Sequence, residues 1–304
     1  MIKIFQKTIG GVVSISGVGL HSGRKSTITL RPAPENTGYL FVSKDAPVPV
    51  EIPAIFDKVV ETVLATTIGE NGFRISTVEH LIAAFRGMDI DNVIVEVDGG
   101  EVPIMDGSAA PFVYMIKKVG VVEQERLRKF IVVNKTVSFE DGEKFIKISP
   151  LLGFEIDFTI DFPHPAIGRQ FLKFDFSPEN FEKEIARART FGFYKEVEFL
   201  KSKGLALGGS LENAVVVGNE GIINEEGLRM KDELVRHKIL DLIGDIALLG
   251  YPVLGKIEAY KSGHDLNNKL CRELFENRED FKVVEFIPSH CFSNPLFQNA
   301  FSAV

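Results

Sequence analysis

Residues 236–260, RHKILDLIGDIALLGYPVLGKIEAY, give the clearest indication of the fold. They begin at a histidine, continue through an apolar segment at helical spacing, pass a glycine and end in residues typical of a strand. Residues 79–97, EHLIAAFRGMDIDNVIVEV, follow the same order. We interpret the two stretches as a duplicated α-β unit, with His80 and His237 at comparable positions in two facing domains. The similarity is short and is weak evidence by itself.

The helix expected at 235–245 carries titratable side chains within an apolar segment. Its apolar positions are Ile239, Leu240, Leu242, Ile243 and Ile246. His237, Asp241 and Asp245 recur every fourth residue and therefore share one face. His237 and Asp241 lie one turn apart, as two protein ligands of one metal ion would. A solvated face, or a histidine paired with a carboxylate, explains the same pattern, so both interpretations stay open.

The composition is that of a well-packed globular protein. The chain has 304 residues, of which 45% are apolar and 25% charged, and at this length two domains are the natural expectation. Lys and Arg number 35 against 42 Asp and Glu, a net charge of -7. This balance gives no general attraction to nucleic acid or to an anionic membrane, so any basic site must be local.

Cysteine content and the N-terminus indicate the compartment. Cys271 and Cys291 are too few for a disulfide framework, and neither has the paired spacing of a thiolate zinc site. Gln6 and Lys7 interrupt the N-terminal apolar run before a signal-peptide core could form. No stretch approaches the ~20 apolar residues of a membrane span. We expect a cytoplasmic protein without a transmembrane segment.

Short strands and a few helices together predict an α+β fold. Strand-like segments joined by glycine turns fill the first hundred residues, and residues 76–88 have helical spacing. The charge run 123–129 is interpreted as the crossover between domains. We therefore place an N-terminal domain at 1–125 and a C-terminal domain at 126–304.

The second half contains clear local signals. Asp141-Gly142 separates two alternating segments and predicts a hairpin. Residues 154–162, FEIDFTIDF, alternate without a break and predict a strand with one apolar face. Ser177, followed by Pro178, is expected to cap a helix. Another short helix is expected to end at Gly204.

A catalytic zinc site generally has three protein ligands and an open position for water, so a further histidine is expected. Among six histidines, His80 is the best candidate because Glu79 precedes it. An acid next to a ligand can act on the reacting water as general base. Ser76-x-x-Glu79 is also a capping-box pattern that explains Glu79 without catalysis, and the sequence does not decide between the two.

His264 follows a predicted strand and a glycine, where a loop could present it to a cleft. Asp245 could orient this histidine and favour its protonated form. A protonated histidine there would stabilise an oxyanion and protonate a leaving amine. A solvated loop histidine is the alternative.

Other stretches indicate substrate binding. Residues 188–193, ARTFGF, and 205–210, LALGGS, combine small and aromatic residues, and Lys238 and Lys261 could hold phosphates locally. The connection 193–217 is unusually apolar. It is either packed in the core or a groove for an aliphatic chain.

Seven blocks occur in order along the chain: TVEHLIAAF, EVPIMDGSAAPF, IARARTFGF, GLALGGSLENAVVV, NEEGLR, VRHKILDLIGD and YKSGHDLNNKL. Together they closely resemble the zinc-dependent UDP-3-O-acyl-N-acetylglucosamine deacetylases of lipid A biosynthesis. The likeness extends from GVGLHSG to LNNKL, nearly the whole sequence. Seven ordered blocks are far more specific than any one motif.

The resemblance implies two domains, each a layered α+β sandwich of a small sheet against helices, with the active site between them. It implies that His80, His237 and Asp241 hold the zinc and that Glu79 is the general base. His264 resembles the general acid and oxyanion partner, with Asp245 beside it. Thr190 resembles the hydroxyl that contacts the reacting carbonyl.

The resemblance also implies a substrate site and a reaction. The positions that match the sugar and nucleotide site are Phe191, Lys238, Phe162 and Lys261, and the apolar insertion around 194–217 matches the acyl-chain passage. The implied reaction releases acetate from UDP-3-O-(3-hydroxyacyl)-N-acetylglucosamine and leaves a free amine. Ferrous iron suits the same ligands as Zn²⁺. We expect a monomer that binds this substrate and no nucleic acid.

Two alternative functions remain open at this stage. The first is a zinc amidohydrolase acting on another acylated amino sugar or on a peptide, with the same site. The second is a non-catalytic α+β module whose histidines are structural.

Overall fold

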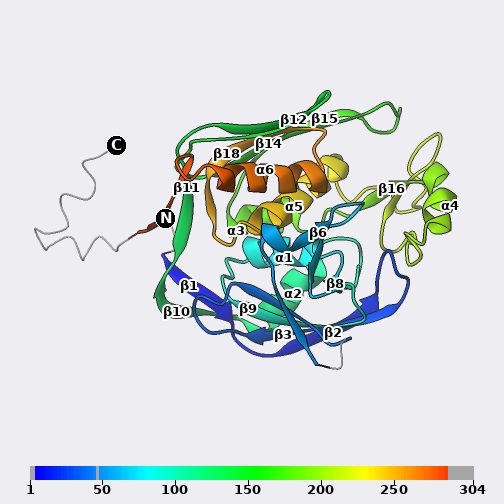
Figure 1. Ribbon diagram of the computed structural model, residues 1–304. Coiled ribbons are helices and arrows are strands. Elements are labelled where there is room, and N and C mark those ends of the chain that lie inside the picture. Colours follow the sequence, from blue (N-terminus) through cyan, green and yellow to red (C-terminus); the bar gives the residue numbers. More distant parts are fainter. Residues whose placement is uncertain (1–3, 46–47, 287–304) are drawn as a thin grey trace, which may run out of the picture.

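The computed structural model describes residues 4–45 and 48–286 and has a mixed α/β fold with several sheets (Figure 1). The two larger sheets lie on opposite sides of the molecule, with the main helices between them. One hydrophobic core cluster includes residues from both halves of the chain. The layers therefore run sheet, helices, helices, sheet.

The first large sheet belongs to the first hundred residues. Its strands, in spatial order, are β2 (Val13–Val18), β3 (Lys25–Pro32), β9 (Val93–Asp98), β4 (Tyr39–Ser43) and β5 (Val50–Pro53). The central strand β9 is antiparallel to β3 and parallel to β4. Helices α1 (Glu79–Gly87) and α2 (Ala110–Val119) lie over this sheet.

A smaller sheet lies beside α1 and is built from three short antiparallel strands. They are β6 (Val59–Glu61), β7 (Thr67–Glu70) and β8 (Phe73–Ile75). A single 3-10 turn, η1 (Phe56–Lys58), precedes them. This sheet brings the segment just before β7 against the first turn of α1.

The crossover between the two halves is itself a strand. β10 (Val121–Leu127) pairs antiparallel with β1 (Phe5–Ile9). The predicted charge run 123–129 begins in β10, whose side chains are largely exposed, and reaches the first residue of β11 (Lys129–Val133). The predicted boundary at residue 125 therefore falls inside a two-stranded ribbon.

The second large sheet has seven strands: β11 (Lys129–Val133), β12 (Val137–Asp141), β13 (Lys144–Ser149), β14 (Phe154–Phe162), β15 (Gly168–Asp175), β18 (Val253–Tyr260) and β19 (Phe281–Glu285). The hairpin predicted at Asp141-Gly142 is confirmed as β12–β13. The alternation predicted at 154–162 is confirmed as β14, which buries Phe154, Ile156, Phe158 and Ile160. β18 pairs with β13, β11 and β14 and is an interior strand.

The second half also supplies most of the helices. They are α3 (Pro178–Asn180), which continues into the π-helical turn η2 (Phe181–Ile185), α4 (Tyr194–Ser202), α5 (Glu233–Ala247) and α6 (His264–Glu276). As predicted, Ser177 caps the helix at Pro178, its hydroxyl oxygen accepting from the backbone N of Asn180 at 3.0 Å. No helix in residues 4–45 or 48–286 is long and apolar enough to cross a membrane.

The two α-β units identified in the sequence occupy equivalent places. α1 leads to β9 inside the first large sheet, and α5 leads to β18 inside the second. The two helices pack against each other between the sheets. Each half therefore presents its histidine-bearing helix to the other.

Candidate active site

The contact between α1 and α5 positions the site. Gly244 lies on α5 where a Cβ atom would collide with the backbone carbonyl of Glu79. Only a residue without a side chain permits this approach, although glycine inside a helix costs ~1 kcal/mol relative to alanine. The close approach sets the first turn of α1 beside the C-terminal part of α5.

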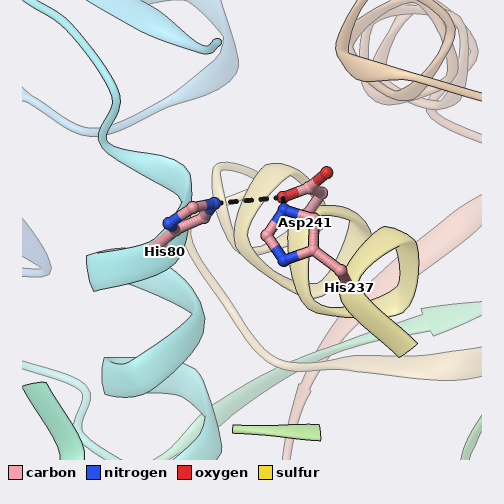
Figure 2. A group of neighbouring side chains, drawn as sticks. All are labelled: His80, His237 and Asp241. Carbon is pink, nitrogen blue, oxygen red and sulfur yellow. Dashed lines mark ion pairs between the residues drawn. The ribbon is translucent and has the colours of Figure 1, made fainter. Parts of the chain in front are cut away.

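His80 from α1 converges with His237 and Asp241 from α5 (Figure 2). Oδ1 of Asp241 lies 3.4 Å from Nε2 of His80 and 3.3 Å from Nε2 of His237. The two imidazole rings meet edge to face, with centroids 4.9 Å apart. All three residues are buried, so the solvated-face interpretation of the His-x-x-x-Asp pattern is wrong.

Two observations fit this cluster to a divalent metal ion. Oδ1 of Asp241 is buried and has no hydrogen-bond donor among the residues that the structure describes, although an unpaired buried carboxylate oxygen is costly. Ligand atoms roughly 2.0–2.2 Å from a tetrahedral ion lie about 3.4 Å apart, close to the separations measured here. The residues therefore fit a metal site with two nitrogen ligands and one oxygen ligand.

Neighbouring groups orient these ligands. Nδ1 of His237 lies 3.1 Å from the carbonyl oxygen of Ala188 and can donate to it, which leaves Nε2 with its lone pair for a metal. Nζ of Lys238 donates to Oδ2 of Asp241 at 2.6 Å. Asp241 thus turns its other oxygen toward the histidines.

The protonation states suit metal binding. Burial lowers the pKa of His237 to about 3, so its ring is neutral near pH 7. Burial opposes the ionisation of Asp241, but His237 and Lys238 hold the pKa of its carboxyl group well below the usual range. A neutral imidazole and an ionised carboxylate are the forms that bind metals.

Glu79 begins α1 but does not form the capping box that the Ser76-x-x-Glu79 pattern allowed. The backbone N of Ser76 donates to the carbonyl of Gly100. Oε2 of Glu79 instead accepts from the backbone N of Thr66 at 3.0 Å, so the capping interpretation is wrong. Burial raises the pKa of Glu79, and its Oε1 lies 3.9 Å from Nε2 of His264. The carboxylate therefore faces the other candidate groups.

His264 is the first residue of α6 and is buried rather than solvated. Its Nδ1 lies 2.8 Å from Oδ2 of Asp245. Burial alone would lower the pKa of His264, but the Asp245 carboxylate outweighs it and raises the pKa to about 9. The imidazole is therefore protonated near pH 7, and the solvated-loop alternative is wrong.

These groups surround one cleft of about 360 Å³. Glu79, His264 and the three metal-binding candidates all contribute to its wall. The predicted residues Thr190, Phe191, Lys238 and Lys261 line it as well. Phe162 does not line the cleft; its ring packs edge to face on Phe191 at 5.7 Å between centroids. Phe162 therefore reaches the cleft only through Phe191.

The apolar segment 194–217 lies at one end of the molecule (Figure 1). It leaves β16 (Phe191–Phe193), includes α4 and returns in β17 (Val215–Val217), which pairs parallel to β16. Tyr194, Phe199 and Leu207 are each at least half exposed. Most of this segment therefore lies outside the core, and the core-packing interpretation holds only at its end, where Val215 and Val217 of β17 are buried in the core.

Sequence reasoning missed several residues around these groups. Thr66 contacts both Glu79 and Asp245, and Nδ2 of Asn267 donates to Asp245 at 2.8 Å. His21, in the GVGLHSG block, has both ring nitrogens buried without a hydrogen bond to any described residue, and burial lowers its pKa. The Thr66–Asp245 contact spans 179 positions, so no local spacing could signal it.

Comparison with known proteins adds independent evidence. Residues 6–276 match the family model described as LpxC: UDP-3-O-acyl N-acetylglycosamine deacetylase. A protein of Histophilus somni (strain 129Pt) is 54% identical over 289 residues, and one of Pasteurella multocida (strain Pm70) is 53% identical; each alignment covers 94% of both chains. A protein of Myxococcus xanthus (strain DK1622) is 53% identical over 279 residues, covering 92% of this chain and 89% of its own. All three are named UDP-3-O-acyl-N-acetylglucosamine deacetylase.

Proposed function

Because the chain belongs to the family of UDP-3-O-acyl-N-acetylglucosamine deacetylases, we propose that it hydrolyses the N-acetyl group of UDP-3-O-(3-hydroxyacyl)-N-acetylglucosamine. Family membership makes it a metal-dependent deacetylase of lipid A biosynthesis. The observation that carries the specific proposal is the buried cluster of His80, His237 and Asp241 on the wall of the cleft that also holds Glu79 and His264.

His80, His237 and Asp241 would hold the metal ion, which we propose to be zinc. A mixed nitrogen and oxygen donor set suits zinc, and ferrous iron could occupy the same ligands. When bound, the ion supplies Lewis acidity toward the acetamide carbonyl. Lys238 keeps Asp241 ionised for this purpose, because its ammonium group contacts the carboxylate oxygen that faces away from the histidines.

Glu79 and His264 would move the protons. Glu79 accepts a proton from the attacking water, whose oxygen bonds to the acetyl carbon. His264, protonated near pH 7, stabilises the developing oxyanion together with the Thr190 hydroxyl and then protonates the leaving nitrogen as the C–N bond breaks. Asp245 holds His264 in its charged form. One proton is taken and one is given, so the products are the amine and acetic acid, which then ionises to acetate.

The remaining lining residues would bind the substrate. Phe191, supported by Phe162, provides an aromatic wall, and the ammonium groups of Lys238 and Lys261 would attract the sugar nucleotide and its phosphates. Lys261 contacts Glu143 in the free protein, so it would exchange that partner for substrate. The exposed apolar segment 194–217 would form the passage for the acyl chain.

The domain division belongs to the same proposal. Residues 1–125 would form an N-terminal domain that carries Glu79 and His80, and 126–304 a C-terminal domain that carries the other groups. Each would be a sandwich of a small sheet and helices, with the active site between them. The two large sheets and the inward-facing helices α1 and α5 support this division. We propose a cytoplasmic monomer.

Amine release from the UDP-linked substrate tests the function. Purified protein is assayed before chelation, after chelation, and after zinc is restored. Turnover that is lost to the chelator and recovered with zinc is expected. A matched substrate without the 3-O-acyl chain should react much more slowly, because it cannot use the apolar passage. Equal turnover of both substrates would favour an amidohydrolase of another acylated sugar, and no turnover of either would favour a binding module.

A further inference from the structure

Thr66 lies between the two proposed proton-transfer groups, Glu79 and His264, and contacts both. It directly precedes β7 and is 2% exposed. Its backbone N donates to Oε2 of Glu79 at 3.0 Å, and its hydroxyl donates to Oδ1 of Asp245 at 2.6 Å. One residue of the first half thus contacts carboxylates on both helices of the site.

The hydroxyl also constrains His264. Oγ1 of Thr66 lies 3.3 Å from Nδ1 of His264. A hydroxyl has one proton, and that of Thr66 is directed to Asp245, so toward His264 its oxygen can only accept. The Asp245 oxygen at 2.8 Å from the same Nδ1 is also an acceptor. Nδ1 must therefore carry the hydrogen, and Nε2 is the atom turned toward Glu79.

The Asp245 carboxylate depends on Thr66 at one of its two oxygens. Oδ2 receives hydrogen bonds from His264 and from Nδ2 of Asn267. For Oδ1, Thr66 is the only hydrogen-bond donor that the described residues supply. A buried carboxylate oxygen that loses its donor is costly, so the carboxylate would rotate or shift without this hydroxyl.

The backbone of Thr66 holds Glu79, the other proposed proton-transfer group. Its carbonyl accepts from the N of Val78 at 3.2 Å, immediately before α1, while its N–H holds the Glu79 side chain. The strand that continues into β7 therefore holds both the start of α1 and the carboxylate on its first residue.

We propose that Thr66 is a positioning residue that sets the general base Glu79 and the His264–Asp245 pair in one fixed geometry. Its hydroxyl orients Asp245 and, with that carboxylate, keeps the hydrogen on Nδ1 of His264, so that Nε2 is the nitrogen that gives its proton, and its N–H orients Glu79. The inference rests on the proposed hydrolysis for its catalytic consequence, but the geometry it describes can be measured without turnover.

Three variants separate the hydroxyl from packing. Thr66→Val has a similar shape and retains the N–H, so only the hydroxyl is lost, and Thr66→Ser restores it. Thr67→Val is the matched control, because the next residue is also buried and its hydroxyl contacts Ser76 instead of the site. In zinc-loaded protein, we expect kcat to fall about tenfold or more in Thr66→Val, with KM and zinc content unchanged. Thr66→Ser should recover most of the rate, and Thr67→Val should keep it.

A second readout does not need turnover. In zinc-loaded, ¹⁵N-histidine-labelled protein, the Nδ1–H signal of His264, assigned by its loss in His264→Gln, should be hydrogen-bonded and slow to exchange. Thr66→Val should shift it and speed its exchange, whereas Thr67→Val should not. If Thr66→Val fails to fold, Thr66→Ala is measured in the same two ways.

The outcomes distinguish the two claims. Loss of rate and a changed His264 signal in Thr66→Val alone support the positioning role. A rate and signal equal to those of Thr67→Val, or a Thr66→Ser as slow as Thr66→Val, overturn it. If the parent protein shows no turnover, the proposed function fails, and the His264 signal alone decides the role of Thr66.

Discussion

His237 and His264 are both buried and both lie next to an aspartate, yet their pKa values shift in opposite directions, to about 3 and about 9. One source of the difference is the set of other contacts that each aspartate makes. Asp241 shares its charge with the Lys238 ammonium, and Nδ1 of His237 faces the neutral carbonyl of Ala188. Burial therefore dominates at His237.

Asp245 has only neutral donors besides His264. Thr66 and Asn267 provide hydrogen bonds without positive charge, so the field of the carboxylate acts mainly on the imidazole. The same pair of residue types thus gives a neutral imidazole at His237, the proposed metal ligand, and a charged imidazole at His264, the proposed proton donor. The partners of each carboxylate contribute to this difference together with other nearby groups, since Glu79 and Asp241 also raise the pKa of His264 and His80 also lowers that of His237.

The largest effect should come from removing the neutral histidine. His237→Ala takes away one of the three proposed ligands, so metal affinity should fall by more than ~100-fold and turnover should disappear with it. Metal content after gel filtration and amine release measure the two effects. A variant that keeps one metal ion per chain and its full rate would remove His237 from the ligand set.

Replacement of the charged histidine should lower the rate without changing the metal content. His264→Ala should lower kcat by ~100-fold or more while metal content stays that of the parent, because general acid–base catalysis typically contributes that much. Glu79→Gln should behave in the same way. An unchanged rate in either variant would reject the proton-transfer role of the replaced residue. If a variant also lost its metal, the proton-transfer groups and the metal-binding residues would not be functionally separate.

The sequence predicts the surroundings of His237 better than those of His264. His237, Asp241 and Asp245 fall on one helical face because the spacing of four is local, and the strand β14 and the Ser177 cap are predicted for the same reason. The Asp245 carboxylate, in contrast, is held by Thr66 from 179 positions away. A threonine hydroxyl in an ordinary strand-like stretch has no pattern that reveals its partner.

Two ambiguous patterns were decided by tertiary contacts. Ser76-x-x-Glu79 fits a capping box, but the N–H of Ser76 is taken by Gly100 and Glu79 turns to Thr66. The apolar segment 194–217 fits a core element by composition, but it lies outside both large sheets and exposes Tyr194 and Phe199. Composition and spacing show which contacts a side chain can make. Which of these contacts forms is decided by neighbours that are distant in the chain.

The pH dependence of kcat should report the protonation of His264, the charged histidine of the two. The folded-state pKa of His264 is raised above its ordinary 6.5 to about 9. The stability from its pairing with Asp245 is therefore fully present below pH 6.5 and is lost as the pH rises through about 9. We expect kcat to fall over the same upper range, because the proton donor is lost.

Asp245→Asn tests the cause of the fall in kcat at high pH, which is the upper limb of the pH profile. Without the carboxylate, burial should dominate and move the limb to lower pH by a unit or more, roughly the size of shift that a close opposite charge produces. Rates measured from pH 6 to 10 in parent and variant give the comparison. If the fall in rate stays at the same pH in the variant, a group other than His264 causes it.

The smallest effect should come from Lys238→Met, and it is the most direct test of the reason for the difference. The variant removes the ammonium that contacts Asp241 at 2.6 Å but keeps an apolar side chain of similar length. Asp241 would then act on His237 more as Asp245 acts on His264, and the pKa of His237 should rise from about 3 by roughly one unit. A titration of the imidazole signals in metal-free protein measures this change, with Lys238→Arg as the control that retains the charge. Because burial is the largest cause of the low value, the ring should still be neutral at pH 7. An unchanged pKa in Lys238→Met would mean that burial alone separates the two histidines and that the partner of the carboxylate has no part in the difference.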